Sequence, residues 1–264
     1  MNTPVLLKID NAVAHIILNR PDQANVLDET TSQRFVEVTN EVAQSCRQGA
    51  IRSVLLSAKG HHFCAGGDIR EFATNSDLSV LLDRSIPHLH AAIHRLHTLP
   101  VPVISAVNGS IGGGGIGIAL CADIVLGSHT MKLRGGYSAI GLSPDVGVSW
   151  FLTRLVGPMR AKQILFTNQV FTARQCLETG LVAELYDDDA LLPAALKLAE
   201  TLAHGASNSL ARIKTLVDQA QTHTLHEHLE MEHLGMVACG ASANAREGVQ
   251  AFLTKRPPQF HKEA

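Results

Sequence analysis

The chain has 264 residues, of which 45% are hydrophobic and 17% charged, and its formal net charge is −2. This composition is sufficient for one large hydrophobic core, and the near-neutral charge argues against nucleic acid as a partner. The sequence shows neither a basic-then-apolar N-terminal signal nor an uninterrupted apolar run of about 18 residues, so we expect a cytoplasmic protein that does not cross a membrane. The five cysteines are scattered and odd in number, which is typical of reduced thiols.

Short apolar runs alternate with helical periodicity through most of the chain. The runs, many of them rich in β-branched residues, predict strands at residues 5–9, 13–18, 51–57, 101–107, 123–127 and 181–185. Capping residues and apolar spacing predict helices after Asp28 or Thr30, over 78–97 and 116–122, from Pro158, between Thr172 and Gly180, and from Asp189 to about Leu253. Strands separated by helical crossovers indicate an α/β fold with parallel pairing, followed by an all-helical last third.

The most distinctive stretch is a glycine run, Gly112 to Gly115, which follows the turn Asn108-Gly109 and precedes a small-residue helix. One explanation is tight packing of the helix on the preceding strand, because glycine permits close backbone approach. A dinucleotide loop is disfavoured, since the acidic residue expected about 20 positions later is absent, and no Gly-Lys-Ser/Thr follows to make a P-loop. The third explanation is an oxyanion hole, which needs a second N–H donor from elsewhere in the chain.

The 14 histidines require that metal binding be weighed. Two groups are close in sequence: His88, His90, His94 and His97, and then His223, His226, His228 and His233. Neither group contains H-E-x-x-H, and neither is accompanied by cysteine pairs at zinc-ligand spacing. We therefore expect solvated helix faces and no metal site.

Five segments, in chain order, resemble the crotonase superfamily, which is also called the enoyl-CoA hydratase/isomerase family. They are NRPDQANVL from Asn19, HFCAGGDI from His62, NGSIGGGGIGIALCAD from Asn108, GLSPDVGVSWFLTRLVG from Gly141 and FLTKRPPQF from Phe252. The resemblance covers essentially the whole chain. It implies an α/β spiral of ββα units over residues 1–200, and a helical C-terminal region over 201–264 that assembles homotrimers, or hexamers made of two trimers.

The resemblance also implies a substrate and a site. The substrate is an acyl-CoA thioester, so coenzyme A is part of the substrate and no separate cofactor is expected. The backbone N–H groups of Gly67 and Gly114 would hold the thioester oxygen as an enolate forms, which supplies the second donor that the glycine run requires. Lys255 of a neighbouring subunit is a candidate for the coenzyme A phosphates, with an ordinary surface lysine as the alternative. The remaining contacts to coenzyme A and substrate are expected from Ala24, Ala65, Gly66, Asp68 and Ile69.

The sequence departs from the family's hydratases at two positions. Their two catalytic glutamates fall on Gly117 and Tyr137 here, which leaves Asp145 as the acidic residue in the right segment. Asp145 is either the catalytic carboxylate or a helix N-cap. A single carboxylate that moves one proton between two carbons suits isomerisation of an unsaturated or ring acyl-CoA better than hydration. His90 is either a second acid or base or an ordinary helix-face residue, and Tyr137 is expected to pack or form a hydrogen bond in the pocket.

Three other functions stay open at this point. The first is enoyl-CoA hydration. The second is hydrolysis through an ester on Asp145, as in the 4-chlorobenzoyl-CoA dehalogenases, although Gly67 and Leu89 stand where those enzymes have bulky rings. The third is a non-catalytic scaffold that binds coenzyme A, because both glutamates are missing.

Overall fold

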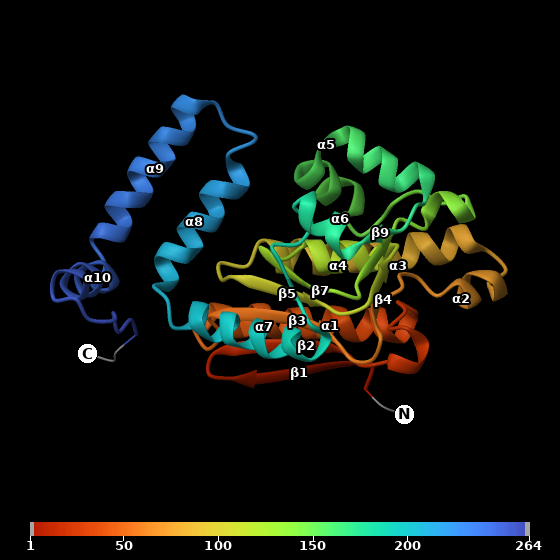
Figure 1. Ribbon diagram of the computed structural model, residues 1–264, viewed down its shortest axis with the longest axis horizontal. Coiled ribbons are helices and arrows are strands. Elements are labelled where there is room, and N and C mark those ends of the chain that lie inside the picture. The colour runs from red at the N-terminus through yellow and green to blue at the C-terminus, as the bar shows by residue number, and fades with distance from the viewer. Residues whose placement is uncertain (1–2, 262–264) are drawn as a thin grey trace.

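The computed structural model describes residues 3–261, which form a large twisted sheet, a smaller sheet and helices on both sides (Figure 1). The large sheet has six strands in the order β1-β2-β3-β5-β7-β10. The first two strands form an antiparallel hairpin, and the other neighbours pair in parallel. The strands are β1 (Val5–Asp10), β2 (Val13–Leu18), β3 (Ser53–Ala58), β5 (Val103–Val107), β7 (Ile124–Ser128) and β10 (Glu184–Tyr186).

A second sheet of four short strands, in the order β4-β6-β8-β9, lies beside the large one. Three of its strands each follow a strand of the large sheet directly in the chain: β4 follows β3, β6 follows β5, and β8 follows β7. A helix follows each of these pairs, so the repeating unit is ββα, and the predicted spiral is confirmed. The strands of this sheet are β4 (His62–Cys64), β6 (Ser110–Gly112), β8 (Lys132–Arg134) and β9 (Phe171–Thr172).

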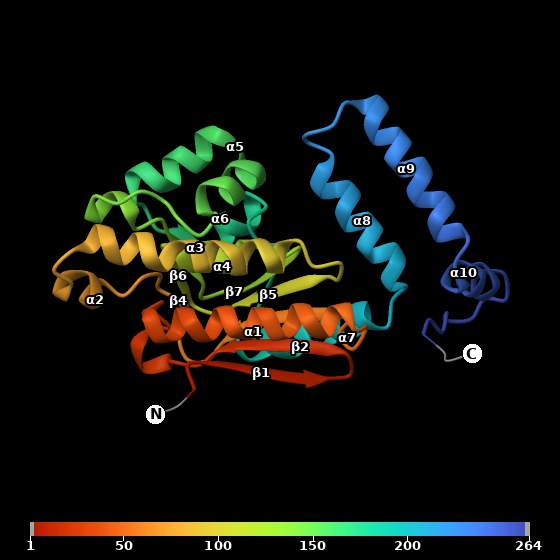
Figure 2. The ribbon, with the colours of Figure 1, turned by 180° about the vertical axis from the view of Figure 1, so that it is seen from behind.

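Helices cover both faces of the large sheet (Figures 1 and 2). On one face, Ala195, Ala199 and Ala203 of α7 (Asp188–Ala203) pack against alternate strand residues such as Leu55 and Ile104. The strand neighbours that point to the other face, including Val54 and Leu56, belong to the main core. Alternate residues of the central strands are therefore buried on opposite faces of the sheet, which explains why these strands are continuous apolar runs in the sequence. The helices on the main-core side are α1 (Glu29–Arg47), α3 (Leu78–His97), α4 (Gly114–Leu120), α5 (Val148–Thr167) and α6 (Ala173–Glu178).

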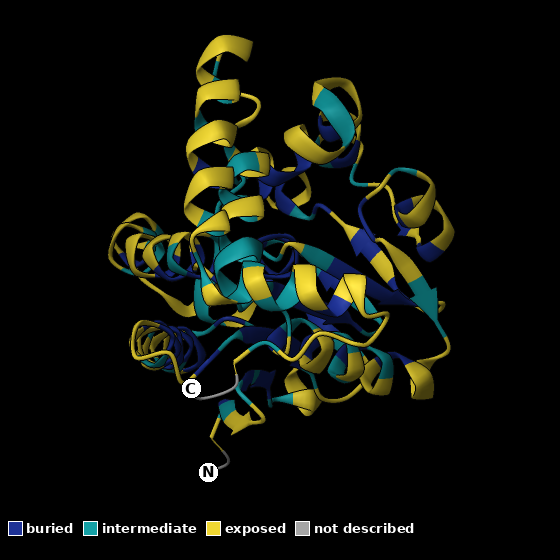
Figure 3. Ribbon diagram, turned by 90° about the vertical axis from the view of Figure 1, so that its left-hand side faces the viewer, coloured by how far each residue is buried: buried dark blue, intermediate teal, exposed yellow. Residues whose placement is uncertain are grey.

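The last three helices, α8 (Ser207–Gln219), α9 (Leu225–Gly240) and α10 (Ala243–Leu253), project away from the sheets (Figure 1). Figure 3 looks at this end of the molecule and shows ribbon that is exposed or intermediate along most of these helices. Exposed patches of this kind mark surfaces that meet other molecules. The large apolar side chains exposed on these helices are Ile213, Val217, Leu225, Leu229, Leu234, Met236, Val237, Val249, Phe252 and Leu253. Within residues 3–261, no helix is both long enough and apolar enough to cross a bilayer.

Several local predictions need correction. The pair Asp10-Asn11 is a turn signal between the first two predicted strands, but the hairpin turns at Asn11 and Ala12, both with positive φ. A short helix, α2 (Ile69–Thr74), follows β4 and was not predicted. Pro158 lies inside α5 after a kink at Gly157, whose φ and ψ are 74° and 164°, and so begins only the second half of that helix.

Asp28, not Thr30, caps α1. Its carboxylate accepts a hydrogen bond from the Thr31 amide at 2.8 Å and forms an ion pair with Arg20. Burial acts to raise the pKa of Asp28, but the hydrogen bonds from Arg20 and Thr31 outweigh it and hold that pKa below its usual value. The ionised form therefore stabilises the fold.

We predict that Asp28→Ala lowers the free energy of unfolding at pH 7 by about 1–2 kcal/mol. Because the folded-state pKa is depressed, this contribution is present above the unfolded value of about 3.9 and is lost as pH falls through the folded value. Denaturant unfolding of both proteins at pH 7 and pH 3 measures the difference. Glu29→Ala, which removes an exposed ion pair with Arg84, is the control and has little effect. An equal loss for Asp28→Ala at both pH values would contradict the prediction.

Candidate active site

Two loops from separate ββα units meet through their backbones. A Cβ placed on Gly66 would lie 2.9 Å from the Gly112 carbonyl oxygen and 3.2 Å from the Gly114 nitrogen, and Gly66 has a φ of +92°. The Leu27 amide donates to the Gly66 carbonyl at 2.8 Å, which ties the same loop to the segment before α1. Only glycine at position 66 permits this approach. The glycine run therefore lets the loop that carries Gly66 approach its backbone closely, in addition to allowing the following helix to pack tightly.

The amides of Gly67 and Gly114 are both available at this junction. Within residues 3–261 neither N–H donates a hydrogen bond to a protein acceptor. Both residues line the same two cavities, and Asp145 lines both as well. The structure thus brings together the three residues predicted to carry the chemistry. Two unpaired amides beside a cavity are the arrangement that a developing oxyanion requires.

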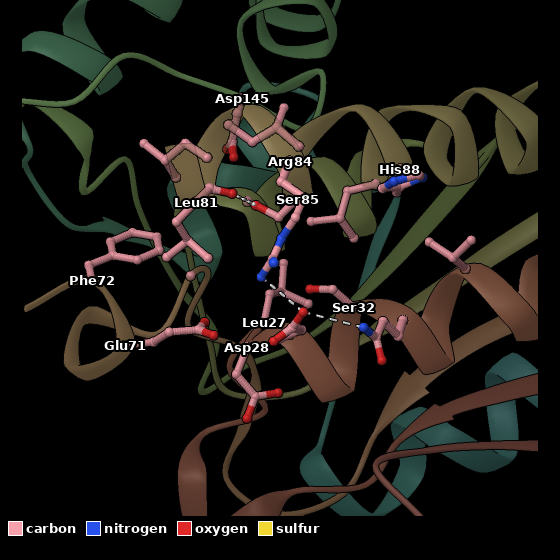
Figure 4. A pocket seen from close by; sticks show the side chains of 18 of the residues that line it. Leu27, Asp28, Ser32, Glu71, Phe72, Leu81, Arg84, Ser85, His88 and Asp145 are labelled. Atoms are coloured by element: carbon pink, nitrogen blue, oxygen red, sulfur yellow. Dashed lines mark hydrogen bonds and ion pairs between the residues drawn. The ribbon is translucent and has the colours of Figure 1, made fainter. Parts of the chain in front are cut away.

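Asp145 lies in the loop before α5, and its side chain is at one end of the first cavity (Figure 4). Its Oδ1 accepts a hydrogen bond from the Tyr137 hydroxyl at 2.6 Å. A Cβ placed on Gly114 would be 3.5 Å from the same oxygen, so the Asp145 carboxylate lies next to Gly114. The alternative of a helix cap is wrong, because α5 begins after Gly147 and has no side-chain cap.

Burial sets the protonation of this pair. It raises the pKa of Asp145, against the lowering effect of the Tyr137 hydrogen bond. It also raises the pKa of Tyr137, and the charge of Asp145 adds to that rise. Tyr137 is therefore a neutral donor that favours the ionised form of Asp145, and Asp145 is a carboxyl group that binds a proton more readily than an exposed one.

Gly117 explains the loss of one hydratase glutamate. A Cβ on Gly117 would lie 2.0 Å from the Val146 carbonyl oxygen, because the loop that carries Asp145 packs directly on α4. The backbone of Val146 fills the space that a side chain at position 117 would occupy. The other glutamate position holds Tyr137, which is buried and engaged with Asp145.

The remaining predicted residues have varied surroundings. The Ala24 carbonyl accepts from the Ala65 amide at 3.0 Å, and Asp68 caps α2 through the Arg70 amide, so both support the loop that carries Gly67. Ala65 and Ile69 line the second cavity. Lys255 follows α10, at the end of the molecule opposite α2 (Figure 1), and so lies away from the site of its own chain.

The two cavities have volumes of about 430 and 660 Å³. The first lies among α1, α2 and α3 (Figure 4), and the second lies between α2, α3 and the loop before α5. The apolar residues that line both cavities were not predicted from the sequence. Leu82 and Ile86 share one face of α3 at helical spacing, a signal that is indistinguishable from an ordinary core stripe. The shared apolar residues are Phe72, Leu82 and Ile86.

The histidine groups do not form a metal centre in the part of the chain that the structure covers, where no three histidine, cysteine, aspartate or glutamate residues cluster to hold an ion. His90 instead lines the second cavity, and its Nε2 accepts a hydrogen bond from the Val146 amide at 3.0 Å.

The spiral of ββα units is the fold that the resemblance to the crotonase superfamily implies. The sequence matches the family model described as enoyl-CoA hydratase/isomerase over residues 8–263, and the chain belongs to this family. It is 35% identical over 261 residues to 1,2-epoxyphenylacetyl-CoA isomerase of Escherichia coli, covering 97% of each chain. It is 32% identical over 254 residues to a probable enoyl-CoA hydratase of Rhodobacter capsulatus, covering 96% of each.

Solved structures agree. The fold matches a putative enoyl-CoA hydratase/isomerase from Mycobacterium abscessus with a TM-score of 0.91 at 29% identity, over 98% of this chain and 100% of that one. The chain is therefore an enzyme of the hydratase/isomerase type.

We predict that Gly117→Ala lowers the free energy of unfolding by about 2 kcal/mol or more, because the added methyl group must displace the Val146 backbone. Gly240→Ala is the matched control: Gly240 ends α9, and a Cβ there would have nothing within 4 Å. The control is expected to be neutral or slightly stabilising. Chemical denaturation of the two variants measures both effects. Wild-type stability in Gly117→Ala would show that the contact is loose.

Proposed function

We propose that the enzyme isomerises an unsaturated or ring acyl-CoA thioester through an enolate, with Asp145 as the group that moves the proton. The observation that carries this proposal is the position of Asp145 beside Gly114, with backbone filling the space at Gly117. A hydratase of this family would need carboxylates at Gly117 and Tyr137. One carboxylate with a neutral tyrosine donor is suited to a proton shuttle.

The proposed chemistry for a 3-enoyl ester has two steps. Ionised Asp145 takes a proton from the carbon α to the thioester, and the electron pair of that C–H bond moves toward the thioester oxygen to give a dienolate. The amides of Gly67 and Gly114 stabilise the negative oxygen. Protonated Asp145 then returns the proton to the γ carbon, and the double bond shifts into conjugation. A raised pKa suits this role because the same group must accept and release the proton.

The cavities support a binding direction. We place the coenzyme A end along Ala24, Ala65, Gly66, Asp68 and Ile69, and the thioester between Gly67 and Gly114. The acyl group then extends into the first cavity, among α1, α2 and α3. Gly67, Gly114 and Asp145 line this cavity and also the second one. Coenzyme A is part of the substrate, and the chemistry calls for no other cofactor.

Assembly is part of the proposal. The exposed apolar side chains of α8, α9 and α10 support a homotrimer, or a hexamer of two trimers, with residues 201–264 as the assembling region. In such an assembly Lys255 of one subunit is a candidate for the coenzyme A phosphates bound at a neighbour, since it is remote from its own site.

Asp145→Asn tests the proton transfer. We expect isomerisation of 3-enoyl-CoA esters to fall by about 10²–10⁴-fold, the usual scale for loss of a general acid–base group. Absorbance of the conjugated 2-enoyl product follows the reaction, and crotonyl-CoA tests for hydration in parallel. Full turnover in Asp145→Asn, or crotonyl-CoA hydration by the wild type at a comparable rate, contradicts the proposal. An aspartyl ester trapped on Asp145 and detected by mass spectrometry would favour hydrolysis instead. If the enzyme converted none of the acyl-CoA esters, a non-catalytic scaffold would be favoured.

The same variant has an expected effect on stability. The folded protein binds the Asp145 proton more tightly than the unfolded chain, so ionisation near neutral pH disfavours folding. Asp145→Asn should therefore raise the free energy of unfolding at pH 7 by about 1 kcal/mol. The gain should shrink as pH falls through the folded-state pKa and vanish below the ordinary aspartate pKa of about 3.9, where both states are protonated. Thermal unfolding at pH 7 and pH 3 measures this, and a variant that is less stable than the wild type at pH 7 would contradict the sign.

Tyr137→Phe tests the hydroxyl donor. Removing the bond that favours ionised Asp145 raises its pKa, so the acidic limb of the kcat profile should move to higher pH. Tyr186→Phe is the matched control, because the Tyr186 hydroxyl bonds to Glu184 on an exposed strand away from the site. Rates of 3-enoyl-CoA isomerisation from pH 5 to pH 9 give both profiles. An unshifted acidic limb in Tyr137→Phe would show that the hydroxyl does not act on Asp145.

A further inference from the structure

Val146, directly after Asp145, has a backbone conformation that its side chain disfavours. Its φ is +52°, in the left-handed region, and the residue is buried. A β-branched residue in this region is a genuine outlier, and its conformation is strained. Such a conformation persists only where surrounding contacts hold it in place.

Three contacts hold Val146. Its N–H donates to Nε2 of His90 at 3.0 Å. Its carbonyl oxygen packs on α4, 2.0 Å from where a Cβ of Gly117 would be. One of its methyl groups, Cγ2, lies 3.0 Å from the Cβ position of Gly114. The contact from His90 is the polar one, and it comes from α3.

The hydrogen bond fixes the state of the His90 ring. A backbone N–H donates and never accepts, so Nε2 must carry no proton. In the neutral imidazole the proton is then on Nδ1. Nε2 is therefore occupied as an acceptor and is not free to take a proton from a substrate.

We infer that His90 is a positioning residue: as a neutral ring protonated on Nδ1, it holds the Val146 amide and so keeps the Asp145 carboxylate beside Gly114 and Tyr137. This inference rests on the proposed role of Asp145 and assigns His90 a part other than acid or base. The peptide between Asp145 and Val146 sets the direction of the carboxylate. If the amide rotated away from His90, the strained φ would relax and Asp145 would turn from the cavity.

Two substitutions separate positioning from acid–base chemistry. His90→Gln keeps an acceptor, since its Oε1 reaches about as far as Nε2, but it cannot titrate. His90→Leu keeps bulk and removes the acceptor. We expect kcat for 3-enoyl-CoA isomerisation to stay within roughly threefold of wild type in His90→Gln and to fall by roughly 10²-fold in His90→Leu, the scale of a misplaced catalytic group, with KM little changed in both.

His94→Leu is the matched control, because His94 is exposed one turn further along the same helix. It should leave kcat and KM unchanged. His90 is also exposed toward the cavity, so its variants are expected to fold, and thermal unfolding checks this. Equal loss of kcat in His90→Gln and His90→Leu would overturn the inference in favour of an acid or base, and unchanged kcat in both would overturn it outright.

A measurement that needs no turnover keeps this inference distinct from the proposed function. The ¹⁵N chemical shifts of the His90 ring in the wild-type protein should show a protonated Nδ1 and a bare Nε2. The ¹³C signal of the Asp145 carboxyl should titrate at a shifted pH in His90→Leu and at the wild-type pH in His90→Gln. Protonation on Nε2, or an unaltered Asp145 titration in His90→Leu, overturns the inference. Full turnover in Asp145→Asn would instead contradict the proposed function. The spectra would still test whether His90 accepts the hydrogen bond from Val146.

Discussion

The close backbone contact between the loops after β4 and β6 is the constraint on which the rest of the site depends. Gly66 approaches the backbone of Gly112 and Gly114, and a Cβ on Gly115 would lie 2.4 Å from the Cys64 carbonyl oxygen. Parallel pairing of β4 with β6 sets the loops side by side, and the absence of side chains lets them touch. Gly67 and Gly114 then line the same two cavities, although they come from different repeats of the spiral.

The second layer of the site is the loop from Pro144 to Val148, which packs on α4 because Gly117 has no side chain. This contact links two departures from the family's hydratases. At the position where the resemblance places one hydratase glutamate, this chain has Gly117, and the backbone of Val146, the residue after Asp145, fills the space that a side chain would take. Tyr137, at the second glutamate position, contributes a neutral hydroxyl to the same carboxylate.

The sequence predicted the four central strands β2, β3, β5 and β7 because their five- and six-residue apolar runs are largely buried on both faces. It did not predict the small sheet, whose strands of two or three residues are stabilised by pairing with distant segments rather than by their own pattern. Asp145 stayed undecided for a similar reason. A proline, an aspartate and then apolar residues are typical of a helix N-cap, and only the left-handed turn through Val146 and Gly147 separates Asp145 from α5. The cavity walls on α3 were hidden because Leu82 and Ile86 resemble core residues.

Two locally unfavourable features are concentrated in the same short loop: a buried carboxyl group with a raised pKa and a valine with positive φ. Neither improves packing, since an asparagine and a glycine would relieve them. A fold retains such features where neighbouring contacts compensate for them, and functional sites are where they gather. Here the compensation comes from three elements, α3 through His90, α4 through Gly117, and the turn at Tyr137. Because these elements are separate in the chain, no local stretch of sequence could have revealed that one aspartate was held by all of them.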